Sequence, residues 1–449
     1  MVTGCGIAPG EAFTYAINTG EQKGTFWLHS HIYGQYVDDL RTPFIIHEKE
    51  PKYEEIPLYF EDWGQTDFRT RAAQNKQTKL SEIPAFYPTA LINDINGNLT
   101  QPIQFNPGTT YRIRVVCMSS SLWFKFTISG HKLQIIEGDG VSALPLEVDG
   151  LGLDPGQRIS ALATAFGSDE FNYLYNVTMY PGFSSNTTLP RYYSGLVNYR
   201  DKAPIKHILQ AKSDDSLVWS DFIDMQQETQ EPLLPVDRQL VWTVRGHATK
   251  YDTPYYSFGN YVYNTTLVPS LFTALTMGDL AFNSSICGPQ SLTHVLRYGE
   301  HIEIQINNPD SRDHNLHMHM HNYQIVEVGP FGNKGPLEFG LKPIYYKHAG
   351  QWPMRGDSAT IRTFSYIKIR FRVDRGFVAL AHCHIETHMD YGMAVTLVAA
   401  PDLLQKHVKT PQSVLQMCRL QNIRTAGNAA GNQGFDLTGL PSPVATKLN

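Results

Sequence analysis

The chain has 449 residues, a formal net charge of −5 and 42% apolar side chains. At roughly 150 residues per domain, this length corresponds to about three domains, and the apolar content is sufficient to bury their cores. The weakly acidic charge and the lack of a long basic run argue against nucleic acid and anionic membrane surfaces as partners, so a small molecule is favoured.

The N-terminal segment MVTGCGIAPGEAF has no basic region followed by an apolar core, and no window offers the roughly 18 unbroken apolar residues of a membrane span. The sequence therefore predicts neither an export signal nor an anchor within this chain. Five Asn-X-Ser/Thr sequons nevertheless favour the secretory route and an extracellular or cell-surface location. They begin at Asn98, Asn176, Asn186, Asn264 and Asn283.

Four of the five cysteines lie outside the histidine-rich stretches described below: Cys5, Cys117, Cys287 and Cys418. An even four allows two disulfides in three possible pairings, which would fit an oxidising compartment. Ordinary buried thiols are the alternative, because four cysteines in so long a chain are not disulfide-dense.

Short segments that alternate apolar and polar residues run through the chain, among them TTYRIRVVCM, EHIEIQINNPD and SYIKIRFRVD. Clusters of Gly, Pro, Asn and Asp separate them at short intervals, so an all-β fold of sandwiches or barrels is expected. We divide the chain into a short first block over 1–50, a β unit over 51–200, a connector with some helical character over 201–235, a second β unit over 236–400 and a tail over 401–449. The Gly/Ala/Pro-rich end of the tail is expected to be loosely ordered.

Nine of the 17 histidines fall in three short stretches, and such clustering indicates metal binding. The stretches are HSH with His29 and His31, HNLHMHMH with His314, His317, His319 and His321, and HCHIETH with His382, His384 and His388. An isolated histidine such as His131 or His301 is better explained as a satisfied core residue.

The last stretch places Cys383 between two histidines. Side chains i and i+2 of a β-strand point to one face and side chain i+1 to the other, so His382 and His384 project together while Cys383 projects oppositely. One strand therefore addresses two metal centres, with a short covalent route for electrons between them.

The donor atoms on each side indicate the metal. A thiolate, two imidazoles and a weak axial thioether form the trigonal site that copper prefers in electron transfer, and Cys383, His388, Met393 and His314 can supply these groups. The other side has six histidines and no thiolate, which suits several copper ions, and zinc or non-haem iron less well. These six are His29, His31, His317, His319, His382 and His384.

The three stretches resemble motifs of the multicopper oxidases, the family of laccases, ascorbate oxidases and fungal ferroxidases. GTFWLHSHIYGQYVDDLRTPFII is similar to the family's second copper motif, HNLHMHMHNYQIVEVG to its third and HCHIETHMDYGM to its fourth. Because LIND, GHKLQIIEGDG, PGQR and PMRGDSATI also follow the family's order, the resemblance covers nearly the whole chain. It implies three tandem cupredoxin-like Greek-key domains, the first truncated, with substrate oxidised at a type 1 copper and dioxygen reduced to water at a trinuclear cluster of type 2 and type 3 copper.

Carried over position by position, the resemblance implies the ligands of each copper. These are His314, Cys383, His388 and axial Met393 for type 1, His317 for type 2, and His29, His31, His319, His382 and His384 for type 3. Glu386 matches an acid that helps deliver protons to the cluster, and a solvated or paired carboxylate is the alternative. His321 matches a position that is not a ligand, so packing or hydrogen bonding is expected for it.

The chain also departs from the family pattern. The family's first copper motif, a His-X-His pair, would precede Met1, so one type 2 and one type 3 ligand are missing and a truncated chain or a genuine short form is expected. Asn315 and Met320 stand where the family prefers Pro and Gly. If the missing ligands are absent from the native protein, the alternative functions are a copper-binding electron carrier without oxygen chemistry or an inactive relative.

Two substrate classes stay open, Fe(II) and phenols, each oxidised with dioxygen as the electron acceptor. The tail is similar to the segment that precedes the membrane anchor of fungal ferroxidases, which act with an iron permease, and Asp310 matches an acid implicated there in taking electrons from ferrous iron. A carboxylate beside the type 1 site suits a hard cation. Ser129 replaces a glutamate of those enzymes, which weakens the case for iron, and Asp310 as an ordinary turn residue is the alternative.

Overall fold

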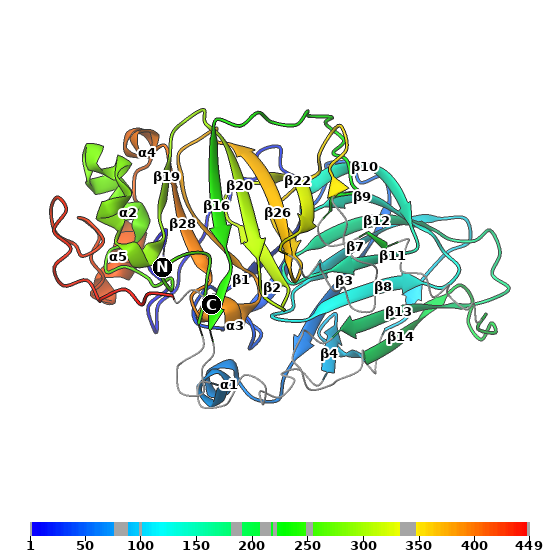
Figure 1. The fold of residues 1–449 in the computed structure, drawn as a ribbon. Helices are drawn as coiled ribbons and strands as arrows, with labels where there is room; N and C mark the ends of the chain where they lie inside the picture. Colours follow the sequence, from blue (N-terminus) through cyan, green and yellow to red (C-terminus); the bar gives the residue numbers. More distant parts are fainter. Residues whose placement is uncertain are drawn as a thin grey trace.

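Strands arranged in facing sheets make up most of the described chain, which confirms the all-β prediction (Figure 1). The computed structural model describes residues 2–75, 89–97, 101–180, 191–206, 217–218, 222–247, 255–332 and 347–446. Within these residues the strands form two β units that lie side by side in Figure 1, and a smaller N-terminal hairpin packs against the first unit.

The first β unit is a sandwich of two sheets. One sheet has the order β10 (Val141–Val148), β9 (Leu133–Gly138), β12 (Arg158–Thr164), β7 (Thr110–Cys117), β3 (Glu54–Trp63), β4 (Thr89–Ile92) and β5 (Ile95–Asn96). The facing sheet has the order β15 (Leu217–Val218), β11 (Gly150–Leu153), β8 (Trp123–Ile128), β13 (Tyr173–Tyr180), β14 (Arg191–Asn198) and β6 (Ile103–Gln104). Antiparallel neighbours dominate, and β3–β7 is a parallel pair.

The second β unit repeats this plan. One sheet has the order β16 (Arg238–Thr243), β20 (His301–Asn308), β26 (Ser365–Arg372), β22 (Tyr323–Pro330) and β23 (Lys347–His348), with β24 (Arg355–Gly356) also paired to β22. The other has the order β19 (His294–Leu296), β28 (Ala394–Ala399), β27 (Phe377–Cys383), β21 (His314–Met318) and β25 (Ser358–Ile361). A small ribbon of β17 (Arg245–His247) and β18 (Tyr255–Ser257) completes the unit.

The alternation in YRIRVVC explains how the first sandwich is covered on both faces. Ile113, Val115 and Cys117 point into the apolar core, while Arg112 and Arg114 point to the opposite face of β7. There Arg114 donates to Thr25 Oγ1 at 2.8 Å, and Thr25 N donates to a carboxylate oxygen of Glu137 at 2.7 Å. The hairpin of β1 (Gly24–His29) and β2 (Arg41–Ile46) is therefore fixed to the first β unit by buried polar contacts.

A buried ion pair joins the two β units. Arg158 in β12 makes a bidentate contact with Asp357, which precedes β25, at 2.7 and 2.8 Å. The same guanidinium donates to the backbone oxygens of Thr25 and Gly156 at 3.1 and 3.0 Å. Arg158 therefore connects the N-terminal hairpin and both β units at one buried point.

The helices are short and lie mostly at the C-terminal end. They are α1 (Phe68–Asn75), α2 (Ser270–Thr276), α3 (Glu386–Asp390), α4 (Pro401–His407) and α5 (Gln412–Leu420), with 3₁₀ turns η4 (Gly278–Phe282), η5 (Ser284–Cys287) and η6 (Pro289–Ser291). The described residues of the connector, 201–206, 217–218 and 222–235, contain no helix, and the rest of the segment for which helical character was expected lies outside the described residues. In the described part of the chain, no helix combines the length and apolar character needed to cross a bilayer.

The C-terminal tail is packed, contrary to the expectation of loose order. Asn428, Ala429 and Ala430 are buried, and the Asn428 side chain donates to the backbone oxygens of Gly434 and Asp436. The Asn428 side chain thus supplies hydrogen bonds to backbone oxygens of its own Gly-rich segment, and composition alone does not reveal such contacts.

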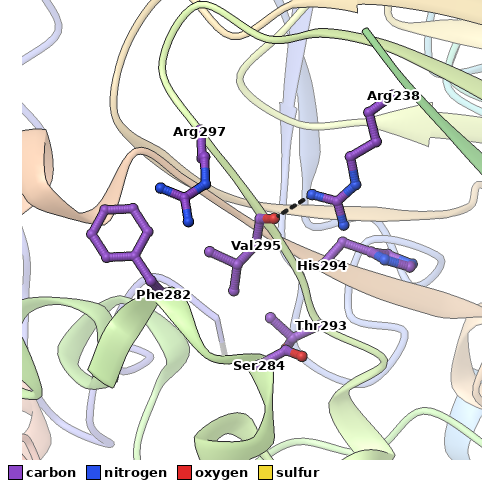
Figure 2. Close-up of a pocket in the computed structure, with 7 residues that line it drawn as sticks. All are labelled: Arg238, Phe282, Ser284, Thr293, His294, Val295 and Arg297. Atoms are coloured by element: carbon purple, nitrogen blue, oxygen red, sulfur yellow. Dashed lines mark hydrogen bonds between the residues drawn. The ribbon is translucent and has the colours of Figure 1, made fainter. Parts of the chain in front are cut away.

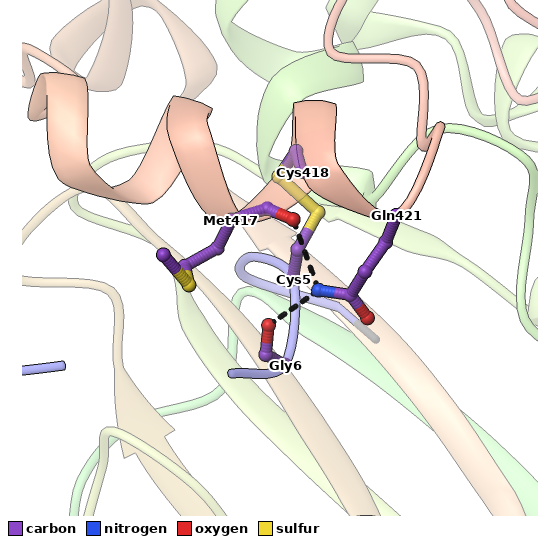
Figure 3. The surroundings of a disulfide bond; sticks show 5 residues. All are labelled: Cys5, Gly6, Met417, Cys418 and Gln421. Atoms are coloured by element: carbon purple, nitrogen blue, oxygen red, sulfur yellow. Dashed lines mark hydrogen bonds between the residues drawn. A yellow bond between two sulfur atoms is a disulfide. The ribbon is translucent and has the colours of Figure 1, made fainter. Parts of the chain in front are cut away.

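One disulfide forms, between Cys5 and Cys418 of α5 (Figure 3). Cys117 and Cys287 are unpaired and buried, so the expectation of two disulfides is wrong. Gln421 reinforces the junction, because its side-chain amide donates to the backbone oxygens of Gly6 and Met417 at 2.6 and 3.0 Å.

Candidate metal centres

A thiol and two imidazoles converge at the end of β27. Cys383 Sγ lies 3.6 Å from Nδ1 of His388 and 4.0 Å from Nδ1 of His314, and the two Nδ1 atoms are 3.1 Å apart. Three chain segments meet here, because His314 opens β21, Cys383 closes β27 and His388 lies in α3. All three side chains are buried. We call this group, with Met393, the thiolate centre.

Met393 is brought back to the same place by the turn that follows α3. The backbone N–H of Cys383 donates to the Met393 oxygen at 3.0 Å, and Met393 N donates to the His388 oxygen at 3.0 Å. The methionine side chain is fully buried. The structure therefore places all four residues predicted for the trigonal copper site in one region.

The chemistry of these donors fits copper. Burial raises the pKa of the Cys383 thiol to about 12 and lowers the pKa of His388. The thiol is therefore protonated and the imidazole neutral at pH 7, and a bound cation would favour loss of the thiol proton to give a thiolate. Nε2 of His314 faces Asp310 Oδ2 at 3.4 Å, which leaves Nδ1 directed at the thiol. A carboxylate behind a ligating imidazole is a common outer partner at metal sites.

Six imidazoles gather on the opposite side of β27, and we call them the imidazole cluster. Ring centroids of neighbouring members lie 4.7–5.7 Å apart, a chain of contacts that joins His29, His31, His319, His317, His382 and His384. His31, His319 and His382 present ligand atoms within 4.8 Å of one another. All six residues predicted to lie together do so, and His31 forms the solvent-exposed side of the cluster.

Outer hydrogen bonds orient several of these rings. Nδ1 of His29, His317 and His382 donates to the backbone oxygens of Ser30, Asp357 and Cys383 at 3.1, 2.9 and 2.9 Å. A carbonyl oxygen can only accept, so Nδ1 carries the proton and the Nε2 lone pair is left for another partner. Burial lowers the pKa of His382 and His384 well below the usual value, so these rings are neutral at pH 7.

The imidazole cluster also fits copper. Buried neutral nitrogens without a proton are good ligands for copper, and the donor set lacks the thiolates of structural zinc sites. Nδ1 of His384 is buried and has no hydrogen-bond partner in the described part of the chain, which a metal ion would satisfy. His319 and His382 approach with their Nε2 atoms 3.1 Å apart.

The close approach of Gly156 to the imidazole cluster leads to a testable prediction. A Cβ at Gly156 would lie 2.5 Å from Cδ2 of His384, so Gly156→Ala must displace that ring. A displacement of about 1 Å can cost on the order of a hundredfold in rate. We expect oxidase turnover to fall by about that factor and copper to be lost from the imidazole cluster, while the blue absorption of the thiolate centre persists.

Gly108→Ala is the matched control for Gly156→Ala. Gly108 has a φ of +75° and Gly156 a φ of +89°, so alanine strains the backbone at both positions, but nothing lies within 4 Å of a Cβ at Gly108. Metal analysis with visible and EPR spectra separates the two variants. Full copper content in Gly156→Ala would show that His384 is not held as described.

The remaining predicted site residues lie at the edges of the centres. Glu386 is buried in the first turn of α3, accepts from Gly34 N at 3.0 Å, and has a pKa that burial raises to about 8. His321 stands outside both centres: its Nδ1 donates to the Asn322 oxygen at 2.8 Å, and its Nε2 lies 3.5 Å from an oxygen of Asp374. Met320, which replaces a preferred glycine, adopts a left-handed φ of +69°.

Four residues close to the centres were missed by the sequence analysis. Trp27 stacks on His29 with ring centroids 4.2 Å apart, and Tyr36 lies 4.8 Å from the same ring. Tyr256 contacts the His388 ring at 4.2 Å, and Asp357 holds His317 through its backbone. The i, i+2 spacing of Trp27 and His29 on β1 was a usable signal, because both project from one face of the strand. Tyr36 lies seven residues after His29, outside any strand periodicity, and Tyr256 and Asp357 are distant in sequence from the rings they contact.

Comparisons with known proteins agree on one family. Family models described as multicopper oxidase match residues 1–51, 54–200 and 263–402. The iron transport multicopper oxidase fetC of Epichloe festucae is 33% identical over 468 aligned residues, covering 98% of this chain and 71% of the relative. The iron transport multicopper oxidase FET3 of Gibberella zeae is 32% identical, with 99% and 72% covered.

Solved structures give the same result for the fold. The crystal structure of Fet3p, titled a multicopper oxidase that functions in iron import, superposes with a TM-score of 0.86 at 26% identity, covering 100% of this chain and 85% of that chain. A laccase from Botrytis aclada superposes with a TM-score of 0.71 at 20% identity, with 94% and 77% covered, which supports the fold alone.

Proposed function

We propose that this chain, which belongs to the multicopper oxidase family, oxidises ferrous iron at the thiolate centre and reduces dioxygen to water at the imidazole cluster. As a member of that family it is an oxidase that uses type 1, type 2 and type 3 copper. Four Fe(II) ions would each lose one electron, and one dioxygen with four protons would give two waters. Relatives named for iron transport support this choice of substrate.

We assign the two groups of ligands from the geometry and the division between type 2 and type 3 copper from the family resemblance. The thiolate centre, with His314, Cys383, His388 and Met393, would hold type 1 copper. His317 would hold type 2 copper, and the other five members of the imidazole cluster would hold the type 3 pair. When bound, copper supplies one-electron redox chemistry at the first site and oxygen reduction at the second. The backbone of residues 382–384 joins the two, since His382 and His384 flank the cysteine.

Asp310 is the observation that carries the iron proposal. Its Oδ2 lies 3.4 Å from His314 Nε2, on the outer side of the ring whose Nδ1 faces Cys383. Burial opposes ionisation, but the contact with His314 and the charge of Arg312 hold the Asp310 pKa at about 2, so the group is anionic. An anion in direct contact with a proposed type 1 ligand would attract a hard divalent cation and hold it close to the centre.

Glu386 is the group we assign to proton delivery. It is buried two residues beyond His384, and its carboxyl group accepts a hydrogen bond from Gly34 N at 3.0 Å, which fixes its position. Water formation consumes protons at the imidazole cluster, and a carboxyl group positioned there can supply them.

Asp310→Asn tests the iron proposal because it removes the charge with little change in shape. We expect kcat/KM for Fe(II) to fall at least about tenfold, which is about 1.4 kcal/mol of transition-state stabilisation, while oxidation of a neutral phenol changes little. The measurement is oxygen uptake with each substrate. Asp402→Asn, at an exposed position in α4, is the control for loss of one negative charge.

Phenol oxidation is the second candidate, and one position favours it. Ser129, where the resemblance would place a second carboxylate, is buried and accepts a hydrogen bond from the Asn176 side chain at 3.3 Å, so it offers no charge for a cation. Equal losses for Fe(II) and phenol in Asp310→Asn would remove the case for iron and leave a laccase-like oxidase.

A further inference from the structure

A cavity of about 240 Å³ lies beside β19 (Figure 2). One water needs roughly 10–15 Å³ of such space, so the cavity is large enough for a small molecule. β16, β19 and the segment from η4 to η5 contribute its lining, with Arg297 coming directly after β19. The residues proposed to bind copper do not line this cavity.

Two guanidinium groups give the cavity its charge. Arg238 Nη1 donates to the Val295 backbone oxygen at 2.9 Å, the bond drawn in Figure 2. Arg297 lies over the Phe282 ring, with its guanidinium carbon 5.3 Å from the ring centroid. Both cations are therefore positioned before any ligand arrives, which lowers the entropic cost of binding.

Hydrogen-bond donors complete the lining. Ser284 brings a hydroxyl group, whereas the Thr293 hydroxyl lies 2.7 Å from Ser291 Oγ and donates to it. His294 Nε2 accepts from the Trp242 indole N–H at 3.1 Å, so the proton of this neutral ring sits on Nδ1, which is then a donor. Burial and the neighbouring Arg238 lower the pKa of His294 to about 4, so this ring adds no charge at pH 7.

No carboxylate lines the cavity among the described residues. Glu300, outside the lining, has one oxygen that accepts from the Arg297 backbone N–H at 2.8 Å and lies 3.9 Å from Arg238 Nη1. Within the described ranges, the Arg297 side chain has no ion-pair partner. The lining thus carries two positive charges and two neutral donors, Ser284 and His294.

We propose that this cavity is a binding site for a small phosphate-bearing ligand, either inorganic phosphate or a compact phosphate monoester. Two guanidinium groups with hydroxyl and imidazole donors match the oxygens of a phosphate group, which guanidinium can contact bidentately. The site is separate from the oxidase chemistry, and a bound phosphate would tie β16 to β19 and to the turn after η4.

Binding is tested on the full copper-loaded protein by calorimetry and by thermal unfolding at constant ionic strength set with chloride. We expect inorganic phosphate or glycerol phosphate to bind saturably and to raise Tm with the logarithm of concentration. Tighter binding of glycerol phosphate would identify a monoester ligand, and equal or weaker binding would identify free phosphate. Failure of both probes to bind would overturn the proposal.

Arg297→Gln should weaken binding at least tenfold, because it removes a charge and the bidentate geometry. Arg297→Lys keeps the charge but not the planar fork, so an intermediate loss is expected. Arg372→Gln, at an exposed position of β26 outside the cavity, is the matched control and should bind as the native chain does. Unchanged affinity in Arg297→Gln would place the ligand elsewhere and overturn the assignment.

Discussion

Replacement of Cys383 by serine is expected to abolish the blue absorption and to lower oxidase turnover by at least about a thousandfold, equivalent to about 4 kcal/mol. A serine hydroxyl keeps its proton at neutral pH and offers copper a hard, neutral oxygen in place of a soft thiolate. His314 and His388 would keep their positions, because β21 and α3 are held by other hydrogen bonds.

The measurement for Cys383→Ser is visible absorption and EPR on the copper-loaded protein, followed by oxygen uptake. Cys117→Ser is the matched control, because Cys117 is an equally buried thiol in the other β unit and donates toward no proposed ligand. That control should stay blue. A blue Cys383→Ser variant would mean that the type 1 assignment is wrong.

Arg158→Leu is expected to reduce the free energy of unfolding by about 3–5 kcal/mol. The substitution leaves the Asp357 carboxylate buried without its bidentate partner, and removing one member of a buried ion pair typically costs that much. Asp139, whose Oδ1 lies 3.3 Å from the same guanidinium, would lose its countercharge as well. The neighbouring His317, held by the Asp357 backbone, should loosen.

Urea unfolding followed by fluorescence measures the loss in Arg158→Leu. Arg200→Leu is the control, because Arg200 is exposed and lies 3.7 Å from an equally exposed Asp169, an arrangement that contributes about 0–1 kcal/mol. Similar losses in the two variants would mean that Arg158 does not join the β units in the way described.

Local spacing accounts for the parts of the site that were predicted. The i, i+2 alternation around Cys383 separates the two centres before any fold is known, and the spacing to His388 and Met393 matches one turn after the strand. His29 and His31 are more than 280 residues from their neighbours in the imidazole cluster. The clustering of histidines and the donor chemistry, rather than any local periodicity, grouped them with the imidazole cluster, and the family resemblance supported that grouping.

The unpredicted features depend on contacts between distant segments. Asp357 lies in the segment PMRGDSATI, and nothing local in that segment shows that Arg158 of the other β unit reaches it. The tail was misjudged for a related reason: its composition is that of a loop, but Asn428 supplies the hydrogen bonds that composition alone cannot reveal. For four cysteines, spacing could not choose among the pairings.

The Cys5–Cys418 bond closes residues 5–418 into a covalent ring. A single proteolytic cut at any position between these cysteines therefore opens the ring without releasing a fragment, and the two pieces stay joined until the bond is reduced. Since both metal centres lie within this ring, damage to one exposed loop need not disperse their ligands. Cleavage would be visible on a denaturing gel only after reduction.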